Sequence, residues 1–247
     1  MCSNKVMTQP ELSVWDTIWQ QISEVTPLLD LTPVLIIGAA VLALVAWHPT
    51  WRVLRNVVTI VHEGCHAFMA LLAGRQLGAI TLHSDTSGLT VTRGRPRGLG
   101  MILTAAAGYT GPAVTGLLGA WVLSRGWSAG LLWGFVLILA LMLLKIRNWY
   151  GLWSLLATGV VIGVVTFFAP AAVQVYLAYA LVLFLLFAAP RPVLELTSQR
   201  RRTPARARTS DADMLGQITW LPAPVWLAIF LILTLGCLTL GAWLILP

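Results

Sequence analysis

"VHEGCHAFMALLAG", Val61 to Gly74, places two histidines and a glutamate in a segment that otherwise resembles a membrane helix. Ionisable groups inside a membrane span cost at least a few kcal/mol each and usually mark a functional site. A polar cluster that only holds helices together would contribute about 1 kcal/mol per contact, and serine or threonine would suffice for it. We therefore expect His62, Glu63 and His66 to form a metal site.

The spacing of these three residues favours zinc. On a helix, His62 and His66 lie one above the other on one face, so that their imidazoles can hold one metal ion. Glu63 lies about 100 degrees round the helix, within reach of a metal-bound water rather than the metal. This is the H-E-x-x-H arrangement of zinc hydrolases, in which zinc lowers the pKa of bound water toward 7 and the glutamate acts as general base.

The composition of the whole chain agrees with a membrane location. The 247 residues are 58% hydrophobic and only 10% charged, with a mean hydropathy of +0.82, whereas soluble domains carry about 25% charged residues. We predict an all-α polytopic membrane protein of about seven transmembrane helices, with a break at Ala169-Pro170. The predicted spans lie near residues 32–48, 54–74, 99–123, 128–145, 150–168, 171–190 and 223–246.

The remaining segments complete this organisation. Residues 1–30 carry four acidic side chains and predict a cytoplasmic tail or a surface amphipathic helix, and residues 31–247 form a single domain. Alternating side chains in "AITLHSDTSGLTVTR" predict a short β-hairpin at residues 78–93, directly after the zinc helix. Its edge would either pair with an extended peptide or plug the cavity. The three cysteines show no paired spacing, which argues against a cysteine zinc site.

Basic residues set the expected orientation. With seven spans, 13 of the 16 Lys and Arg residues fall on the side of the N-terminus. The positive-inside rule then places the N-terminus in the cytoplasm and the C-terminus outside the cell membrane. The basic loop at residues 191–213 is explained by this rule, so we expect no nucleic-acid partner.

A catalytic zinc needs a third protein ligand and an open position for water. Asp85 lies in the predicted turn and has a structural role there, and Glu195 lies in the basic loop, where an arginine could pair with it. Asp211 and Asp213 precede the last apolar run, and Ser210 before them is typical of a helix N-cap. Reasoning from the residues leaves these carboxylates open as the third ligand.

Several segments together resemble one family. They are "HEGCHAFMALLAG", "SGLT" at Ser87–Thr90, "AGYTGPA" at Ala107–Ala113, "RNWYG" at Arg147–Gly151 and "SDADMLGQITWLP" at Ser210–Pro222. In this order they resemble the site-2 protease family of intramembrane zinc metalloproteases, particularly its compact bacterial branch. The resemblance runs from about Asn56 to Trp226, which is most of the chain.

The resemblance has implications for the site. The compact branch takes its third ligand from a Ser-Asp-Ala sequence, matched here by Ser210-Asp211-Ala212, so it implies that His62, His66 and Asp211 bind Zn²⁺. Asp213 and Asp85 are the next candidates. Residues 210–220 would then have to return into the protein as a short helix, which membrane proteins tolerate beside a water-filled cavity.

The expected activity follows from the same resemblance. It implies an intramembrane zinc endopeptidase that cleaves a transmembrane protein substrate within or beside the lipid bilayer, with Glu63 as general base, in regulated intramembrane proteolysis. The alternative is a non-catalytic zinc-binding membrane adaptor or chaperone, although the intact Glu63 argues against it. A protease of prenylated tails would need a late glutamate ligand, and only Glu195 follows Glu63. The sequence does not predict the oligomeric state.

Overall fold

Apolar helices make up most of the structure, a computed structural model that describes residues 13–202 and 210–246. The first part contains α1 (Val14–Ser23), α2 (Leu31–Ala46), α3 (His48–Leu72) and the strands β1 (Gln76–Leu82) and β2 (Gly88–Arg93). The second contains α4 (Leu99–Ser124), α5 (Ser128–Leu143), α6 (Trp149–Phe168), α7 (Ala171–Ala188), α8 (Pro190–Arg202), α9 (Asp211–Ile218) and α10 (Ala223–Ile245). Residues 1–12 of the predicted tail and 203–209 of the predicted basic loop lie outside the described residues.

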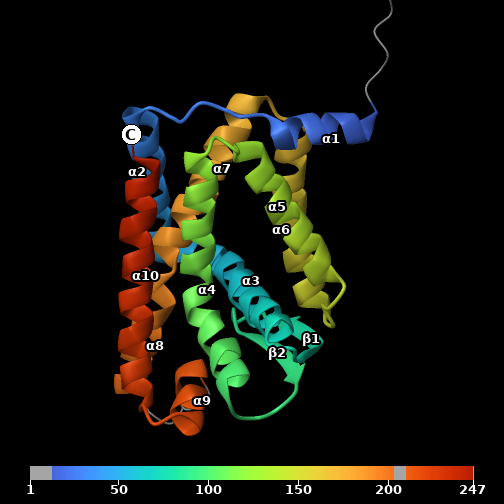
Figure 1. Ribbon diagram of the computed structural model, residues 1–247. Coiled ribbons are helices and arrows are strands. Elements are labelled where there is room, and N and C mark those ends of the chain that lie inside the picture. Colours follow the sequence, from blue (N-terminus) through green and yellow to red (C-terminus); the bar gives the residue numbers. More distant parts are fainter. Residues whose placement is uncertain (1–12, 203–209, 247) are drawn as a thin grey trace, which may run out of the picture.

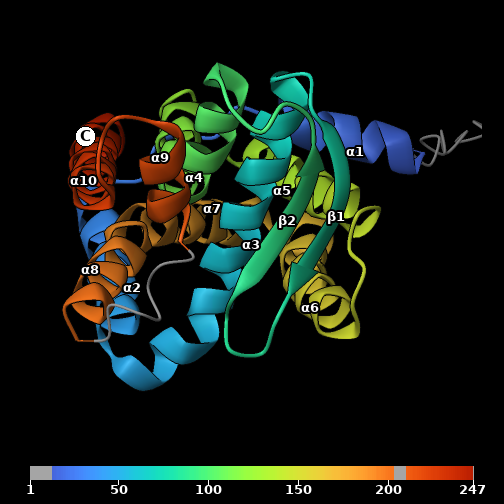
Figure 2. The same cartoon turned by 90° about the horizontal axis from the view of Figure 1, so that it is seen from below.

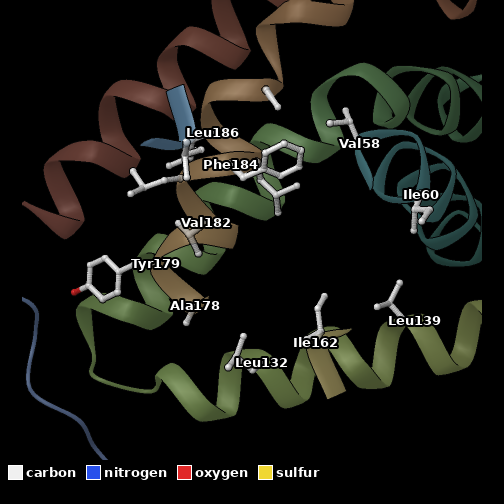
Figure 3. Packing of buried hydrophobic residues seen from close by; sticks show 14 of the residues in the cluster. Val58, Ile60, Leu132, Leu139, Ile162, Ala178, Tyr179, Val182, Phe184 and Leu186 are labelled. Carbon is white, nitrogen blue, oxygen red and sulfur yellow. The ribbon is translucent and has the colours of Figure 1, made fainter. Parts of the chain in front are cut away.

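Helix α7 lies at the centre of the packing and contacts α2, α4, α5 and α10 (Figure 1). Its side chains Tyr179, Val182 and Leu186 are at most 1% exposed (Figure 3). Helix α4 approaches it closely because Gly116 has no side chain, and a Cβ there would lie 2.9 Å from Leu186 Cγ. Small residues that let helices approach closely are typical of packing inside membranes.

Four helices are long and apolar enough to cross a membrane by length and composition: α4, α6, α7 together with α8, and α10. They match four of the predicted spans, at 99–123, 150–168, 171–190 and 223–246. The predicted break is also present, since α6 ends at Phe168 and α7 begins at Ala171. Helix α5 has 16 residues, fewer than the about 20 that a span needs. The count of seven spans is therefore not confirmed.

The predicted spans 32–48 and 54–74 form one bent unit. Helices α2 and α3 meet at an angle of 99°, and together they are long and apolar enough to form a broken span or a re-entrant loop. Trp47 between them has extended backbone angles, and Pro49 stands in the first turn of α3, where its missing N–H is tolerated. The prediction of two separate spans here is not confirmed, because apolar length contains no information on the angle between two adjoining helices.

This bend bears on where α1 lies relative to the end of α10. The prediction placed residues 1–30 and the C-terminus on opposite sides of the membrane. Helix α1 and the last turn of α10 instead lie at the same end of the bundle, whereas the hairpin and α9 lie at the other end (Figure 1). Thr26, just after α1, is fixed there by backbone and side-chain hydrogen bonds to the Gly126 carbonyl between α4 and α5.

The hairpin agrees with the prediction of residues 78–93. Its strands pair antiparallel, with Ile80 opposite Thr90 and Leu82 opposite Gly88. The outer edge of β1 is bonded to the segment after α5, because the Ile80 amide donates to the Lys145 carbonyl at 2.9 Å. The other strand, β2, lies beside α3 (Figure 2).

The predicted basic loop at 191–213 is partly wrong. Pro190–Arg202 forms α8 in direct continuation of α7, and Asp211–Ile218 forms α9. Prolines at the first turn of a helix are tolerated, which explains why Pro190 and Pro192 do not interrupt α8. Arg191 and Glu195 also form an i,i+4 ion pair at 3.2 Å along it.

We expect labelling to detect the shared end of α1 and α10. In a chain whose native cysteines are replaced, single cysteines at the exposed positions Ser23 and Leu246 should react with an impermeant thiol reagent from one side of sealed vesicles. A cysteine at the exposed Arg95, beside the hairpin, should react only from the other side. Labelling of Ser23→Cys and Leu246→Cys from opposite sides would contradict the arrangement.

Candidate metal centre

Two histidines on α3 form the first part of the site. His62 and His66 lie one turn apart, and their Nε2 atoms are 3.1 Å from each other. The Nδ1 atom of His66 lies 2.7 Å from the backbone carbonyl oxygen of Thr104 on α4. A carbonyl only accepts, so Nδ1 of His66 carries the proton and Nε2 presents a lone pair. Such a bond orients an imidazole for metal binding.

The third member comes from a distant part of the sequence. Asp211, the first residue of α9, places its Oδ2 atom 3.2 Å from Nε2 of His62 and 3.2 Å from Nε2 of His66. Helix α9 returns to lie beside α4 and near α3 (Figure 2), as the resemblance required. The structure thus brings the predicted ligands His62, His66 and Asp211 into one cluster.

The geometry of this cluster fits a small divalent cation. The three ligand atoms form a triangle with edges of 3.1 and 3.2 Å. Tetrahedral ligands about 2.0 Å from a zinc ion are separated by about 3.3 Å. In the neutral tautomer, Nε2 of His66 is an acceptor that faces the Asp211 oxygen at 3.2 Å, and a proton or a cation between the two atoms stabilises such a pair. Two imidazoles and one carboxylate are a typical ligand set of catalytic zinc.

Helix α9 is held in place by its own polar contacts. Ser210 caps the helix and exchanges hydrogen bonds with Asp213, and Arg200 of α8 donates to both carboxylate oxygens of Asp213 at 2.7 Å. Burial raises the pKa of Asp213, but the bonds from Arg200 and Ser210 outweigh it and keep this pKa below its usual range. Ala212 and Leu215 are fully buried on the other face of the helix. Asp213, an alternative ligand, thus fixes α9 instead of joining the cluster.

The other candidate ligands lie elsewhere. Asp85 is exposed in the hairpin turn, where hydrogen bonds from the hydroxyl and amide of Ser87 lower its pKa. Glu195 on α8 accepts a hydrogen bond from the Trp51 indole at 2.6 Å and one from Arg191 at 3.2 Å. Both carboxylates therefore have the structural roles that the sequence suggested for them.

Glu63 lies beside the cluster and is fixed by the hairpin. Its side chain is buried, and its Oε2 atom accepts a hydrogen bond from the Thr90 hydroxyl at 2.7 Å. Gly88 faces the other oxygen, because a Cβ at this position would clash with Glu63 Oε1. Thr90 and Gly88 belong to the "SGLT" segment, but their contact with Glu63 was not predicted from the sequence.

A cavity of about 410 Å³ contains the cluster and Glu63. Tyr109 of α4 lines it, with its ring edge-on to His62 at 5.0 Å between centroids and stacked on Phe230 at 5.4 Å. Gly108 leaves room for the imidazoles, since a Cβ there would clash with His66 Nε2. Tyr109 belongs to the "AGYTGPA" segment, and no role of its own was predicted for it from the sequence. Asn148 of the "RNWYG" segment bonds the backbone of Leu82 in β1.

The fold and the cluster together define a multi-pass membrane protein with a candidate metal centre on a helix that carries H-E-x-x-H. Residues 35–241 match a family model described as Peptidase M50B-like. The match covers most of the chain, so the chain belongs to this family, and the resemblance to the site-2 proteases is confirmed. The comparisons with curated proteins and with solved structures found no match.

The contact between Arg200 and Asp213 predicts an effect on metal affinity. Asp213→Asn removes the charge that Arg200 holds, so α9 should present Asp211 less rigidly and zinc affinity should fall about tenfold. Asp85→Asn is the matched control, because it removes a carboxylate from the hairpin turn, and it should leave the affinity unchanged. Titration of the metal-free protein with zinc measures both. A loss of affinity in Asp85→Asn would contradict the assignment.

Proposed function

We propose that this protein is an intramembrane zinc endopeptidase that hydrolyses a peptide bond in a transmembrane or membrane-proximal segment of a protein substrate. The observation that carries the proposal is the presence of His62, His66 and Asp211 in one cavity with the buried carboxylate of Glu63. Membership of the Peptidase M50B-like family supports a protease activity. A site that only stabilised the fold would need no base beside it.

His62 and His66 would hold the zinc through Nε2, and Asp211 would hold it through a carboxylate oxygen. When bound, zinc acidifies water and polarises the carbonyl of the substrate. Thr104 keeps the ring of His66 in the orientation that points Nε2 at the metal position. Asp211 would balance part of the charge of the ion, and its contacts with His62 and His66 bring the start of α9 next to α3.

Glu63 would act as the general base. Thr90 donates to Oε2, which leaves Oε1 to accept a proton from the attacking water. The same oxygen then returns the proton to the nitrogen of the leaving amine, so that the carboxylate is restored after each turnover. Glu63 lies on α3 and contacts the hairpin through Thr90 and Gly88. Binding of substrate at the hairpin would therefore act directly on the base.

Strand β2 would bind the substrate in an extended conformation. Among the described residues, its edge away from β1 has no backbone hydrogen-bond partner, and Leu89, Thr90 and Thr92 line the cavity. A substrate strand could pair with this edge by β-augmentation. A transmembrane helix must unwind locally before it is cleaved, and an unpaired edge would satisfy the backbone groups that unwinding frees.

The end of the bundle with the hairpin and α9 would face the cytoplasm. The end of β2, the start of α6 and the end of α8 lie at this end of the bundle (Figure 1). By their positions in the sequence, Arg93 ends β2, Arg147 precedes α6 and Arg200 lies in the last turn of α8. In residues 13–202 and 210–246, the opposite end contributes Arg125 together with the acidic residues of the α1 region. The positive-inside rule then places α1 and the end of α10 outside, which revises the expected position of the N-terminal segment.

A pair of substitutions tests the proposed function. Glu63→Gln should keep one zinc per chain but lower cleavage about 100-fold or more, because the base is lost while the ligands remain. Asp211→Asn should weaken zinc binding by more than about 100-fold, since it removes a ligand. Zinc content is measured on the purified protein, and cleavage is measured with a single-span substrate in proteoliposomes.

The two alternatives give different results in this experiment. Full cleavage by Glu63→Gln would disprove the mechanism. Zinc binding without any cleavage by the unaltered protein would favour the non-catalytic adaptor. Unchanged zinc affinity in Asp211→Asn would exclude Asp211 as the ligand.

Thr90 allows a finer test of the base. Thr90→Val has nearly the same shape but cannot donate to Glu63, and a hydrogen bond to a charged group contributes about 1.5–3 kcal/mol. We expect kcat to fall about tenfold or more, with zinc content and KM unchanged. Thr90→Ser restores the hydroxyl and should recover most of the rate. An equal loss in both variants would show that packing, rather than the hydrogen bond, is responsible.

A further inference from the structure

A second cavity of about 630 Å³ continues the cleft away from the zinc ligands. It lies between the first turns of α3, the hairpin turn and α8 (Figure 2). Arg55, Thr86 and Tyr109 line both cavities, so the two spaces adjoin. The cleft is therefore longer than the metal site requires, and its lining continues along α3 from His62 to Arg55, Arg52 and His48.

The charged side chains that line this second cavity differ in how many hydrogen bonds they make. The Oε1 atom of Glu195 already accepts from the Trp51 indole and from Arg191, and the Arg191 guanidinium also lies over the Trp51 ring at 4.5 Å. Arg55 approaches Oε2 of Glu195 only at 3.4 Å, and no hydrogen bond to that oxygen results.

The guanidinium of Arg55 can therefore still donate hydrogen bonds to a ligand in the cleft. Its side chain is 40% exposed, and among the described residues its guanidinium makes no hydrogen bond beyond this distant ion pair. A guanidinium carries five N–H donors in a fork that matches a carboxylate. Arg52 adds a second positive charge to the lining of the same cavity. The lining also contains the carboxylates of Asp85 and Glu195, but Ser87 bonds the first, and Trp51 and Arg191 bond the second. The guanidinium of Arg55 is therefore the group in this cavity that is complementary to an acidic side chain.

The position of Arg55 on α3 fixes its distance from the reaction. Arg55 precedes His62 by seven residues, so both lie on one face of the helix, about 10 Å apart along its axis. An extended strand rises about 3.3 Å per residue. A substrate strand that follows the cleft would therefore bring a residue about three positions from the scissile bond next to Arg55.

We propose that Arg55 is a specificity-determining residue, whose guanidinium binds an acidic side chain of the substrate about three residues from the scissile peptide bond. This inference rests on the proposed endopeptidase function. It adds a preference for charge that neither the metal centre nor the edge of β2 would supply, because a strand edge recognises backbone whatever the side chains are.

Binding of extended peptides to zinc-loaded Glu63→Gln protein tests the preference without consuming the peptide. A panel carries Asp, Asn or Lys at each of four positions on either side of one central bond, and fluorescence anisotropy in detergent gives the Kd values. The bond itself is located by mass spectrometry after digestion with the unaltered protein. Asp should bind about fivefold more tightly than Asn at one position about three residues from that bond, as expected for a partly exposed ion pair.

Substitutions of Arg55 in the same background give the decisive comparison. Arg55→Gln should abolish the preference for Asp, and Arg55→Glu should reverse it in favour of Lys at the same position. Arg125→Gln, at the far end of the bundle, is the control and should leave the preference intact. Zinc content reports whether each variant folds.

Two results would overturn the inference. One is a preference for Asp over Asn that is as strong in Arg55→Gln as in the protein that keeps Arg55. The other is equal binding of the Asp and Asn peptides at every position of the panel while Arg55 is present. Absence of cleavage of every peptide by the unaltered protein would instead contradict the proposed function.

Discussion

The approach of one carboxylate to two imidazoles is the interaction on which the site depends. Asp211 meets His62 and His66 because α9 packs against α4 and α10, a docking supported by buried Leu215 and by the Arg200–Asp213 pair. Lone pairs that face one another at 3.2 Å repel unless a cation or proton lies between them. A bound metal would therefore stabilise the docking of α9, and the same docking raises the affinity for the metal.

The bend between α2 and α3 determines where this site lies. If the two helices were separate spans, the histidines would lie in the middle of a lipid-facing helix. The 99° angle instead directs α3 toward the end of the bundle with the hairpin and α9 (Figure 1). Threonines of α3, the hairpin and α4 line the cavity there, in contrast to the apolar surfaces of α5 and α6. Hydrolysis needs water, and a polar cleft at this end would supply it without opening the bundle.

The sequence predicted those features that depend on local pattern. Residue spacing identified His62, Glu63 and His66, and apolar length identified four long spans. Asp211 was different, because several carboxylates remained possible and only the resemblance favoured it. The bend at Trp47, the helical α8 and the shared end of α1 and α10 were not predicted, since hydropathy reports neither angles nor how far a helix continues beyond the membrane. The contact of Thr90 with Glu63 depends on tertiary packing, which spacing in the sequence does not encode.

Asp211 differs from Asp85, Glu195 and Asp213 in the groups that it contacts, and this difference leaves it available to a metal ion. Asp213 is bonded by Arg200, Glu195 by Trp51 and Arg191, and Asp85 by Ser87. A carboxylate that is held by arginine or by backbone has little capacity left for a metal ion. Asp211 faces imidazoles instead of guanidinium groups, so its charge remains available to a cation. Which carboxylate can serve as the metal ligand therefore depends on two things. One is the position of Asp211, and the other is that arginine, tryptophan or serine already bonds Asp213, Glu195 and Asp85.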